Sequence, residues 1–132
     1  MGVAVCRPLH YSGMEKNRYT CNGMTVITDY ACESEAAAKA ALQMLSQQSG
    51  KKIALIEECY AALANADAVI PLPQPSQDRA ERMSAELERE KQLLQALEPG
   101  CAVLLCGGRH MELNVTLRRV FGLTDGDVYD RT

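Results

Sequence analysis

The stretch from residue 66 to residue 110, ADAVIPLPQPSQDRAERMSAELEREKQLLQALEPGCAVLLCGGRH, contains two short apolar runs on either side of a long charged segment. The runs, residues 68–72 and 102–106, lack polar alternation, as expected of strands covered on both faces of a parallel sheet. The charged segment predicts a helix over residues 76–97, which Ser76 caps and Pro99 and Gly100 terminate. This order predicts a βαβ unit, the repeating unit of parallel α/β folds.

Two details of this unit lead to specific expectations. Pro71 and Pro73 cannot donate ladder hydrogen bonds, so the first strand is expected either to end near Ile70 or to have a bulged end. Glu90 shares a helical stripe with apolar residues that should face the core. It either lies at the edge of this stripe and reaches water, or points its carboxylate into a pocket over the sheet. The apolar members of the stripe are Ala80, Met83, Leu87, Leu94 and Leu97.

Length and composition predict a single α/β domain over residues 1–132, with a small parallel, Rossmann-like sheet flanked by helices. The formal net charge of −3 gives no electrostatic footprint for nucleic acid. No apolar run is long enough to span a membrane, and the N-terminus does not resemble a secretory signal. The chain is therefore predicted to be cytoplasmic, with no membrane partner and no nucleic-acid partner.

The six cysteines are more than usual for a chain of this size. Without a secretory signal, they are expected to be reduced thiols. Cys101, Cys106 and His110 have spacings that could reach one metal ion, and Cys6 and His10 could add donors. No Cys-x-x-Cys pair is present, and the pair at 101 and 106 belongs to a predicted buried strand, which favours thiols acting as small hydrophobic side chains. Neither a metal nor a cofactor is therefore expected.

The N-terminal half is less regular than the central unit. Residues 1–23 are expected to form an irregular segment, although Asn22-Gly23 before the strand-like residues 24–28 is a hairpin signal. Ser34 is predicted to cap a helix that Gly50 ends.

The pattern leaves two further segments open. Residues 51–65 favour a helix over 57–64, with 52–56 as either its first turns or a short strand. Residues 111–121 fit a strand and a helix equally well, whereas 123–132 are expected to form a surface tail.

Three loops are expected to meet at the carboxyl edge of the sheet, where open α/β sheets bind ligands. These loops, residues 29–34, 72–78 and 107–111, offer a set of polar side chains and a glycine pair. Gly107 and Gly108 let a backbone approach a ligand, and free helix N–H groups bind anions. Arg109 adds a fork suited to phosphate or carboxylate. The alternative is an ordinary turn with a solvated arginine. The polar candidates are Asp29, Gln74, Ser76, Asp78, Arg109 and His110.

The stretch Ala-Asp-Ala-Val-Ile (66–70), the loop Pro-Gln-Pro-Ser (73–76), a helix with a glutamate and a strand ending in Gly-Gly-Arg resemble the nucleoside 2-deoxyribosyltransferase-like superfamily. The resemblance covers residues 57–110. It implies that Glu90 attacks the anomeric carbon of a sugar, with Asp78 as the acid that protonates the leaving base. Lys91 follows Glu90, where the family usually has a small residue.

Two functional hypotheses follow. The first is a small nucleotide- or nucleoside-binding protein, with or without N-glycosidic bond chemistry through Glu90. The second is a non-catalytic interaction protein, such as an inhibitor or an accessory factor of a mobile element. The departure at Lys91 favours the second, and the glycine pair in register with Arg109 favours the first. The expected partners are a nucleotide or nucleoside, a protein, or a second copy of the chain.

Overall fold

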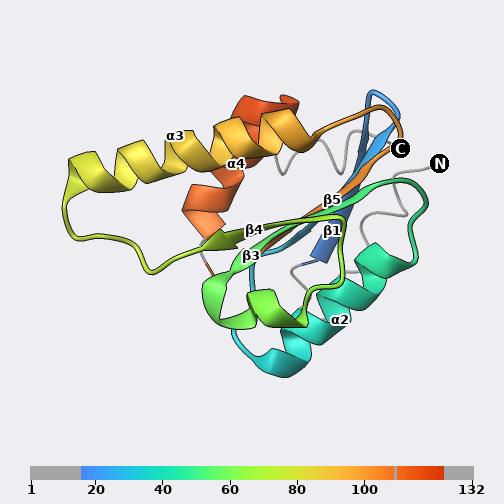
Figure 1. The fold of residues 1–132 in the computed structure, drawn as a ribbon, viewed down its shortest axis with the longest axis horizontal. Coiled ribbons are helices and arrows are strands. Elements are labelled where there is room, and N and C mark those ends of the chain that lie inside the picture. The colour runs from blue at the N-terminus through green and yellow to red at the C-terminus, as the bar shows by residue number, and fades with distance from the viewer. Residues whose placement is uncertain (1–15, 109, 124–132) are drawn as a thin grey trace.

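The computed structural model describes residues 16–108 and 110–123, and these form a sheet covered by helices on both faces (Figure 1). The strands are β1 (Lys16–Cys21), β2 (Met24–Asp29), β3 (Lys52–Glu57), β4 (Ala68–Leu72) and β5 (Ala102–Cys106). The helices are α2 (Glu35–Ser46), the 3-10 helix η1 (Glu58–Leu63), α3 (Arg79–Ala96) and α4 (His110–Phe121).

The sheet has the order β1-β2-β5-β3-β4. Among the strands of the described residues, the β1–β2 pair is antiparallel and the other pairs are parallel, with β5 between β2 and β3. After β2, the chain forms β3 one position further along the sheet and then β4 beside β3. It crosses back through α3, and β5 takes the position between β2 and β3. This arrangement confirms the predicted α/β fold and its central βαβ unit.

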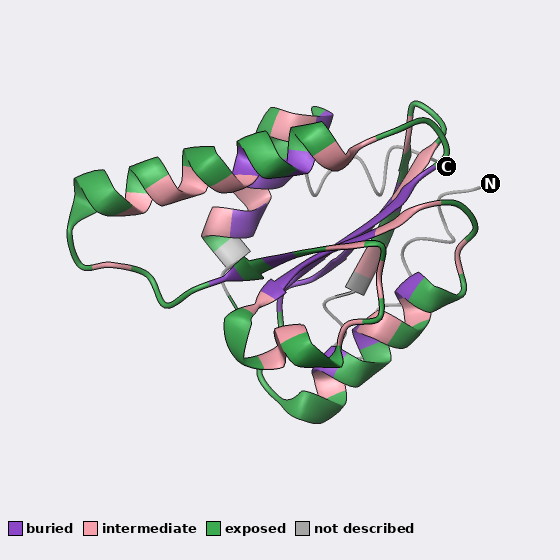
Figure 2. Ribbon diagram, in the orientation of Figure 1, coloured by how far each residue is buried: buried purple, intermediate pink, exposed green. Residues whose placement is uncertain are grey.

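Two hydrophobic clusters, one on each face, hold the helices on the sheet. The first joins Leu93 of α3 and Leu113 and Leu117 of α4 to one face of the strands. The second joins Ala38 and Ala41 of α2 to the opposite face, where alanine permits close packing. Buried residues are concentrated in the strands between these layers (Figure 2).

The N-terminal hairpin signal is confirmed, and the interpretation of residues 1–23 as irregular is wrong for the part described. β1 pairs with β2 through a tight turn in which Asn22 and Gly23 have φ values of 52° and 80°. Two positive φ values are typical of a type I′ hairpin turn. Residues 1–15 lie outside the described part of the chain.

The structure assigns a secondary structure to both ambiguous segments. Residues 52–57 form β3, and the expected helix after them is the short η1. Residues 110–121 form α4, and Gly122 follows it with a φ of 69°, as a helix C-terminus favours. Leu123, expected in a surface tail, is buried in the first cluster, and residues 124–132 lie outside the description.

β4 continues to Leu72 and keeps a one-to-one register with β3, so the expected end near Ile70 is wrong and the described strand has no bulge. β4 is an edge strand, and Pro71 is exposed there. A proline on the free side of an edge strand removes no ladder hydrogen bond.

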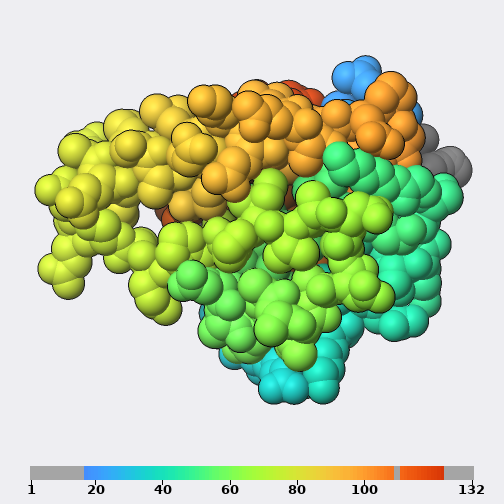
Figure 3. Space-filling view, viewed as in Figure 1, coloured from blue at the N-terminus to red at the C-terminus, as the bar shows by residue number. Residues whose placement is uncertain are grey.

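The expected orientation of the central helix is also wrong. Leu93 is fully buried, whereas Met83, Leu87 and Leu94 expose 47, 54 and 56% of their surface. The space-filling view shows that the first turns of α3 and the loop before it stand out from the body of the protein (Figure 3). The first half of α3 does not cover the sheet, and in its second half Leu93 faces the core while the neighbouring Leu94 of the predicted stripe faces outward.

Candidate functional site

The carboxyl ends of β2 and β5 form the centre of the candidate site. Asp29 ends β2, Cys106 ends β5, and the two residues are Cα partners in the parallel ladder. The helices that follow these strands leave in opposite directions, since α2 packs on one face of the sheet and α4 on the other. Such a divergence between neighbouring parallel strands opens a crevice where α/β proteins bind ligands.

Asp29 is held rigidly at this edge. The backbone N–H of Gly107 donates to the Asp29 carbonyl oxygen at 3.0 Å, which joins the ends of the two strands. The N–H of Ala31 donates to Asp29 Oδ1 at 3.1 Å, which orients the carboxylate. The side chain is almost completely buried, so these bonds fix its position in a region with little access to water.

The glycine pair at the end of β5 is required by the limited space around it and not by an unusual backbone conformation. Neither Gly107 nor Gly108 has a positive φ. A Cβ at Gly107 would lie 3.1 Å from Glu57 Oε2, and a Cβ at Gly108 would lie 3.1 Å from the carboxylate of Glu33. Two acidic side chains thus approach the backbone closely, and any larger residue at these positions would press against them.

Tyr60 of η1 borders the same edge. Burial raises the pKa of its phenol, and the nearby Cys59 and Cys32 raise this pKa further. The hydroxyl therefore stays protonated through neutral pH and is a hydrogen-bond donor beside acidic and thiol groups.

Ser76 and Asp78 lie elsewhere, at the start of α3. Asp78, and not Ser76, is the N-cap, because its Oδ1 accepts from the N–H groups of Ala80 and Glu81 at 2.8 and 3.1 Å. Ser76 donates its hydroxyl to Glu81 at 2.7 Å and accepts from the N–H of Asp78 at 3.0 Å. These bonds stabilise the helix start.

A groove of about 210 Å³ lies beside this helix start. Its arginines are already engaged, since Arg82 donates to the Ser76 carbonyl at 2.9 Å and Arg89 is ion-paired with Glu112. The volume is below the usual range for small-molecule sites. We therefore place the candidate site at the sheet edge and not in this groove.

Glu90 contacts α4 and not the crevice. Its Oε2 accepts from Arg119 Nη1 at 3.0 Å, and the carboxylate is nearly buried between the two helices. Asp78 precedes Glu90 by 12 positions, which is about 18 Å along a helix axis. Carboxylates that share a glycosidic bond lie roughly 5–9.5 Å apart. The structure does not bring these two residues together.

The outcome for the predicted site is mixed. Asp29, Gly107 and Gly108 lie together at the carboxyl ends of β2 and β5. Arg109 lies outside the described residues, as does the side chain of His110, whose backbone begins α4. The sequence reasoning missed Cys32, Glu33, Glu57 and Tyr60; only the Asp-x-x-Cys spacing directly after β2 could have indicated one of them.

The Glu90–Arg119 pair leads to an asymmetric prediction. Arg119→Ala leaves a carboxylate that is only 10% exposed without this partner, so it should lower the free energy of unfolding by about 1–3 kcal/mol. Glu90→Gln leaves Arg119, which is 42% exposed, in contact with water and should cost less than about 1 kcal/mol. Urea denaturation of both variants measures the difference. Equal losses, or a larger loss in Glu90→Gln, would contradict the buried ion pair.

Comparison with known proteins supports the fold and nothing finer. No protein family matches the chain, and no curated protein matches it. Among solved structures, it is similar to a domain of a Haemophilus ducreyi protein described as a UDP-N-acetylmuramate:L-alanyl-γ-D-glutamyl-meso-diaminopimelate ligase. The match has 15% identity and a TM-score of 0.54, and covers 79% of this chain and 94% of that one.

This likeness supports a Rossmann-like fold and gives no support to the resemblance to nucleoside 2-deoxyribosyltransferases. In the part of the chain that the structure describes, no helix is both long and apolar enough to cross a membrane. What these findings establish is the architecture, a mostly parallel α/β sheet of the Rossmann-like type.

Proposed function

We propose that the protein binds a nucleotide in the crevice at the carboxyl ends of β2 and β5. The observation that carries the proposal is the divergence of α2 and α4 to opposite faces of the sheet directly after these neighbouring strands. Loops and helix N-termini meet at such a point, and their free N–H groups favour anionic ligands.

The glycine pair supports the same position. Gly107 and Gly108 place no side chain directly after β5, which lets a phosphate approach the backbone that leads to the start of α4. The similar H. ducreyi ligase is described with a UDP-linked substrate. This description agrees with a nucleotide ligand here.

The acidic residues at the edge determine the form of the ligand. Glu33 and Glu57 lie against the glycine pair, and their charges repel a free phosphate. A divalent cation between them neutralises the negative charges of both the glutamates and the phosphate. We therefore expect the Mg²⁺ complex of a nucleoside diphosphate or triphosphate to bind more tightly than the metal-free nucleotide.

The proposal does not include cleavage of an N-glycosidic bond. Asp78 caps α3 and Glu90 pairs with Arg119, so neither carboxylate is available at the crevice. Binding is therefore expected without turnover of a nucleoside.

Thermal unfolding with UMP, UDP, ADP and ATP, each with and without Mg²⁺, tests the proposal. A ligand at 100 times its Kd adds about 2.7 kcal/mol to the free energy of unfolding, which raises the Tm by roughly 5–10 °C. Gly108→Ala should fold normally, because the exposed Glu33 side chain can move away from the new methyl group. The methyl group should weaken nucleotide binding by about tenfold or more.

Lys39→Ala is the matched control, since Lys39 lies on the exposed face of α2 and pairs with Glu35 of the same helix at 3.0 Å. It should leave both the Tm and the ligand-induced shift unchanged. The absence of a shift with every nucleotide, with and without Mg²⁺, would contradict the proposal. An equal loss of binding in Gly108→Ala and Lys39→Ala would place the ligand elsewhere.

A homodimer formed through α3 is the second candidate, because this helix exposes large apolar side chains. Met83, Leu87 and Leu94 are about half exposed on a helix that stands out from the body. The helix carries four acidic and four basic residues, so its net charge neither repels a second copy nor selects a strongly charged partner. Sedimentation equilibrium tests this candidate, and a monomer at every concentration would contradict it.

A further inference from the structure

Three buried side chains with metal-binding atoms meet at the carboxyl edge of the sheet. They are Asp29 at the end of β2, Cys32 in the following loop and Cys106 at the end of β5. The carboxylate oxygen and the two sulfur atoms all lie within 4.8 Å of one another. The three residues expose 2, 1 and 0% of their surface, so the donor atoms are brought together inside the protein and not on a mobile surface.

The fold holds these donors in place without a metal. Asp29 and Cys106 are Cα partners in the β2–β5 ladder, so their separation is determined by strand pairing. The hydrogen bond from Ala31 to Asp29 Oδ1 orients the carboxylate and shapes the turn that leads to Cys32. Hydrogen bonds that orient a ligand in this way are typical of metal sites.

The chemistry of the donors selects the metal. Two thiolates and one carboxylate are ligands for a borderline-soft ion, whereas Mg²⁺ and Ca²⁺ require oxygen donors alone. Zn²⁺ accepts sulfur and oxygen ligands in tetrahedral geometry, and three protein ligands leave one position for water or a substrate. We propose that Asp29, Cys32 and Cys106 form a Zn²⁺ site with three protein ligands.

The charge balance is favourable. Zn²⁺ binding converts both cysteines to thiolates and releases their protons to solvent, so that two thiolates, one carboxylate and the ion sum to −1. The charge of the ion is therefore balanced by its own ligands at this buried position, which limits the desolvation cost.

This site does not depend on nucleotide binding. Zn²⁺ affinity is measured without nucleotide, and the two thiols are not part of the proposed phosphate position at Gly108.

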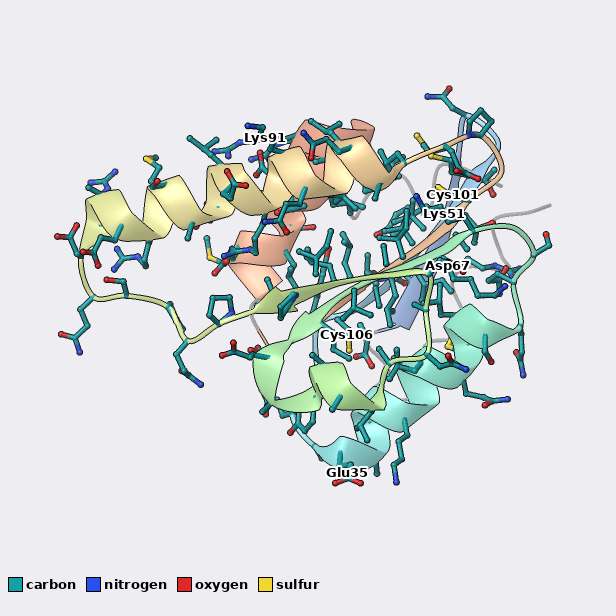
Figure 4. The ribbon with its side chains drawn as sticks, viewed as in Figure 1. Glu35, Lys51, Asp67, Lys91, Cys101 and Cys106 are labelled. Atoms are coloured by element: carbon teal, nitrogen blue, oxygen red, sulfur yellow. The ribbon has the colours of Figure 1, made fainter. Side chains whose placement is uncertain are left out.

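The lower face of the sheet in Figure 4 holds Cys106, whereas Cys101 lies at the opposite end of β5. Cys101 and the exposed Cys59 therefore serve as matched controls for the loss of a thiol.

Reduced, metal-free protein is titrated with Zn²⁺ and, in a parallel experiment, with Co²⁺ as a spectroscopic probe. We expect one ion per chain, release of two protons, and a cobalt spectrum with thiolate charge-transfer bands and tetrahedral d–d bands. Cys32→Ser, Cys106→Ser and Asp29→Asn should each weaken Zn²⁺ binding by about 100-fold or more, since even outer-shell changes cost 10–100-fold. Cys59→Ser and Cys101→Ser should bind as the unsubstituted protein does.

Circular dichroism identifies any variant that does not fold, and Cys32→Ser is the safest of the three because Cys32 lies in a loop. Binding that survives Cys32→Ser and Asp29→Asn, or that is lost equally in Cys59→Ser, would overturn the proposal. A cobalt spectrum without thiolate bands would overturn it as well. A reduced protein that binds no Zn²⁺ and forms a Cys32–Cys106 disulfide on exposure to air would show that the two thiols are a redox pair instead.

Discussion

Gly50→Ala is expected to lower the free energy of unfolding by about 2–5 kcal/mol, which combines backbone strain with a steric overlap. Gly50 lies in the turn before β3 and has a φ of 83°, a conformation that costs alanine about 1–2 kcal/mol. A Cβ at this position would also overlap the carbonyl oxygen of Gly100 and lie 3.2 Å from its carbonyl carbon. The obstacle is backbone, so no side-chain rotation relieves it.

The surroundings of this turn prevent a simple shift. The N–H of Ala102 donates to the Lys51 carbonyl at 2.8 Å, which joins the first residue of β5 to the residue just before β3. Lys51 Nζ donates to the Ala96 carbonyl at 2.8 Å and ties the same turn to the end of α3. Movement of Gly100 away from a methyl group would therefore disturb the ends of three elements.

Gly100→Ala is the matched control for this prediction. Gly100 has a φ of 80°, nearly the same as Gly50, but a Cβ there would meet no atom within 4 Å. It should therefore cost only the backbone term of about 1–2 kcal/mol. Thermal and urea denaturation of both variants measure the difference. Equal losses would mean that the two turns do not pack against each other as described.

The elements of the fold were predictable where local rules act alone. Asn22-Gly23 predicted the hairpin, Ser34 caps α2 as expected through its bond to Ala37, and the apolar runs predicted β4 and β5. The strand order was not predictable. It depends on which strands pair, and no feature of the sequence indicates that β5 lies between β2 and β3.

The same limit applies to the candidate site. Asp29 and the glycine pair follow apolar runs, so their common position at the sheet edge could be predicted from parallel pairing. Cys32 and Cys106 could not be joined to Asp29, because their proximity depends on the register between β2 and β5. Ser76 was misplaced because the loop over residues 73–78 leads away from the sheet before α3 begins.

The orientation of α3 leads to the second large prediction. Leu93→Ala should destabilise the protein by about 2–5 kcal/mol, whereas Leu87→Ala should cost less than about 0.5 kcal/mol. Leu93 is fully buried in the cluster that joins α3 to the sheet, and its truncation leaves a cavity among side chains that α4 and the strands hold in place. Leu87 is 54% exposed, so its side chain loses few contacts.

These two leucines make a direct test, because they have the same chemistry and lie on the same helix. Alanine has the higher helix propensity at both positions, so the helix itself does not account for a difference. The apolar stripe in the sequence contains Leu87 and not Leu93, and it therefore predicts the opposite order of losses. Urea denaturation at a protein concentration where the chain is monomeric separates the two orientations. A larger loss in Leu87→Ala would mean that α3 packs with its apolar stripe toward the sheet. It would also remove the exposed face on which the proposed homodimer depends.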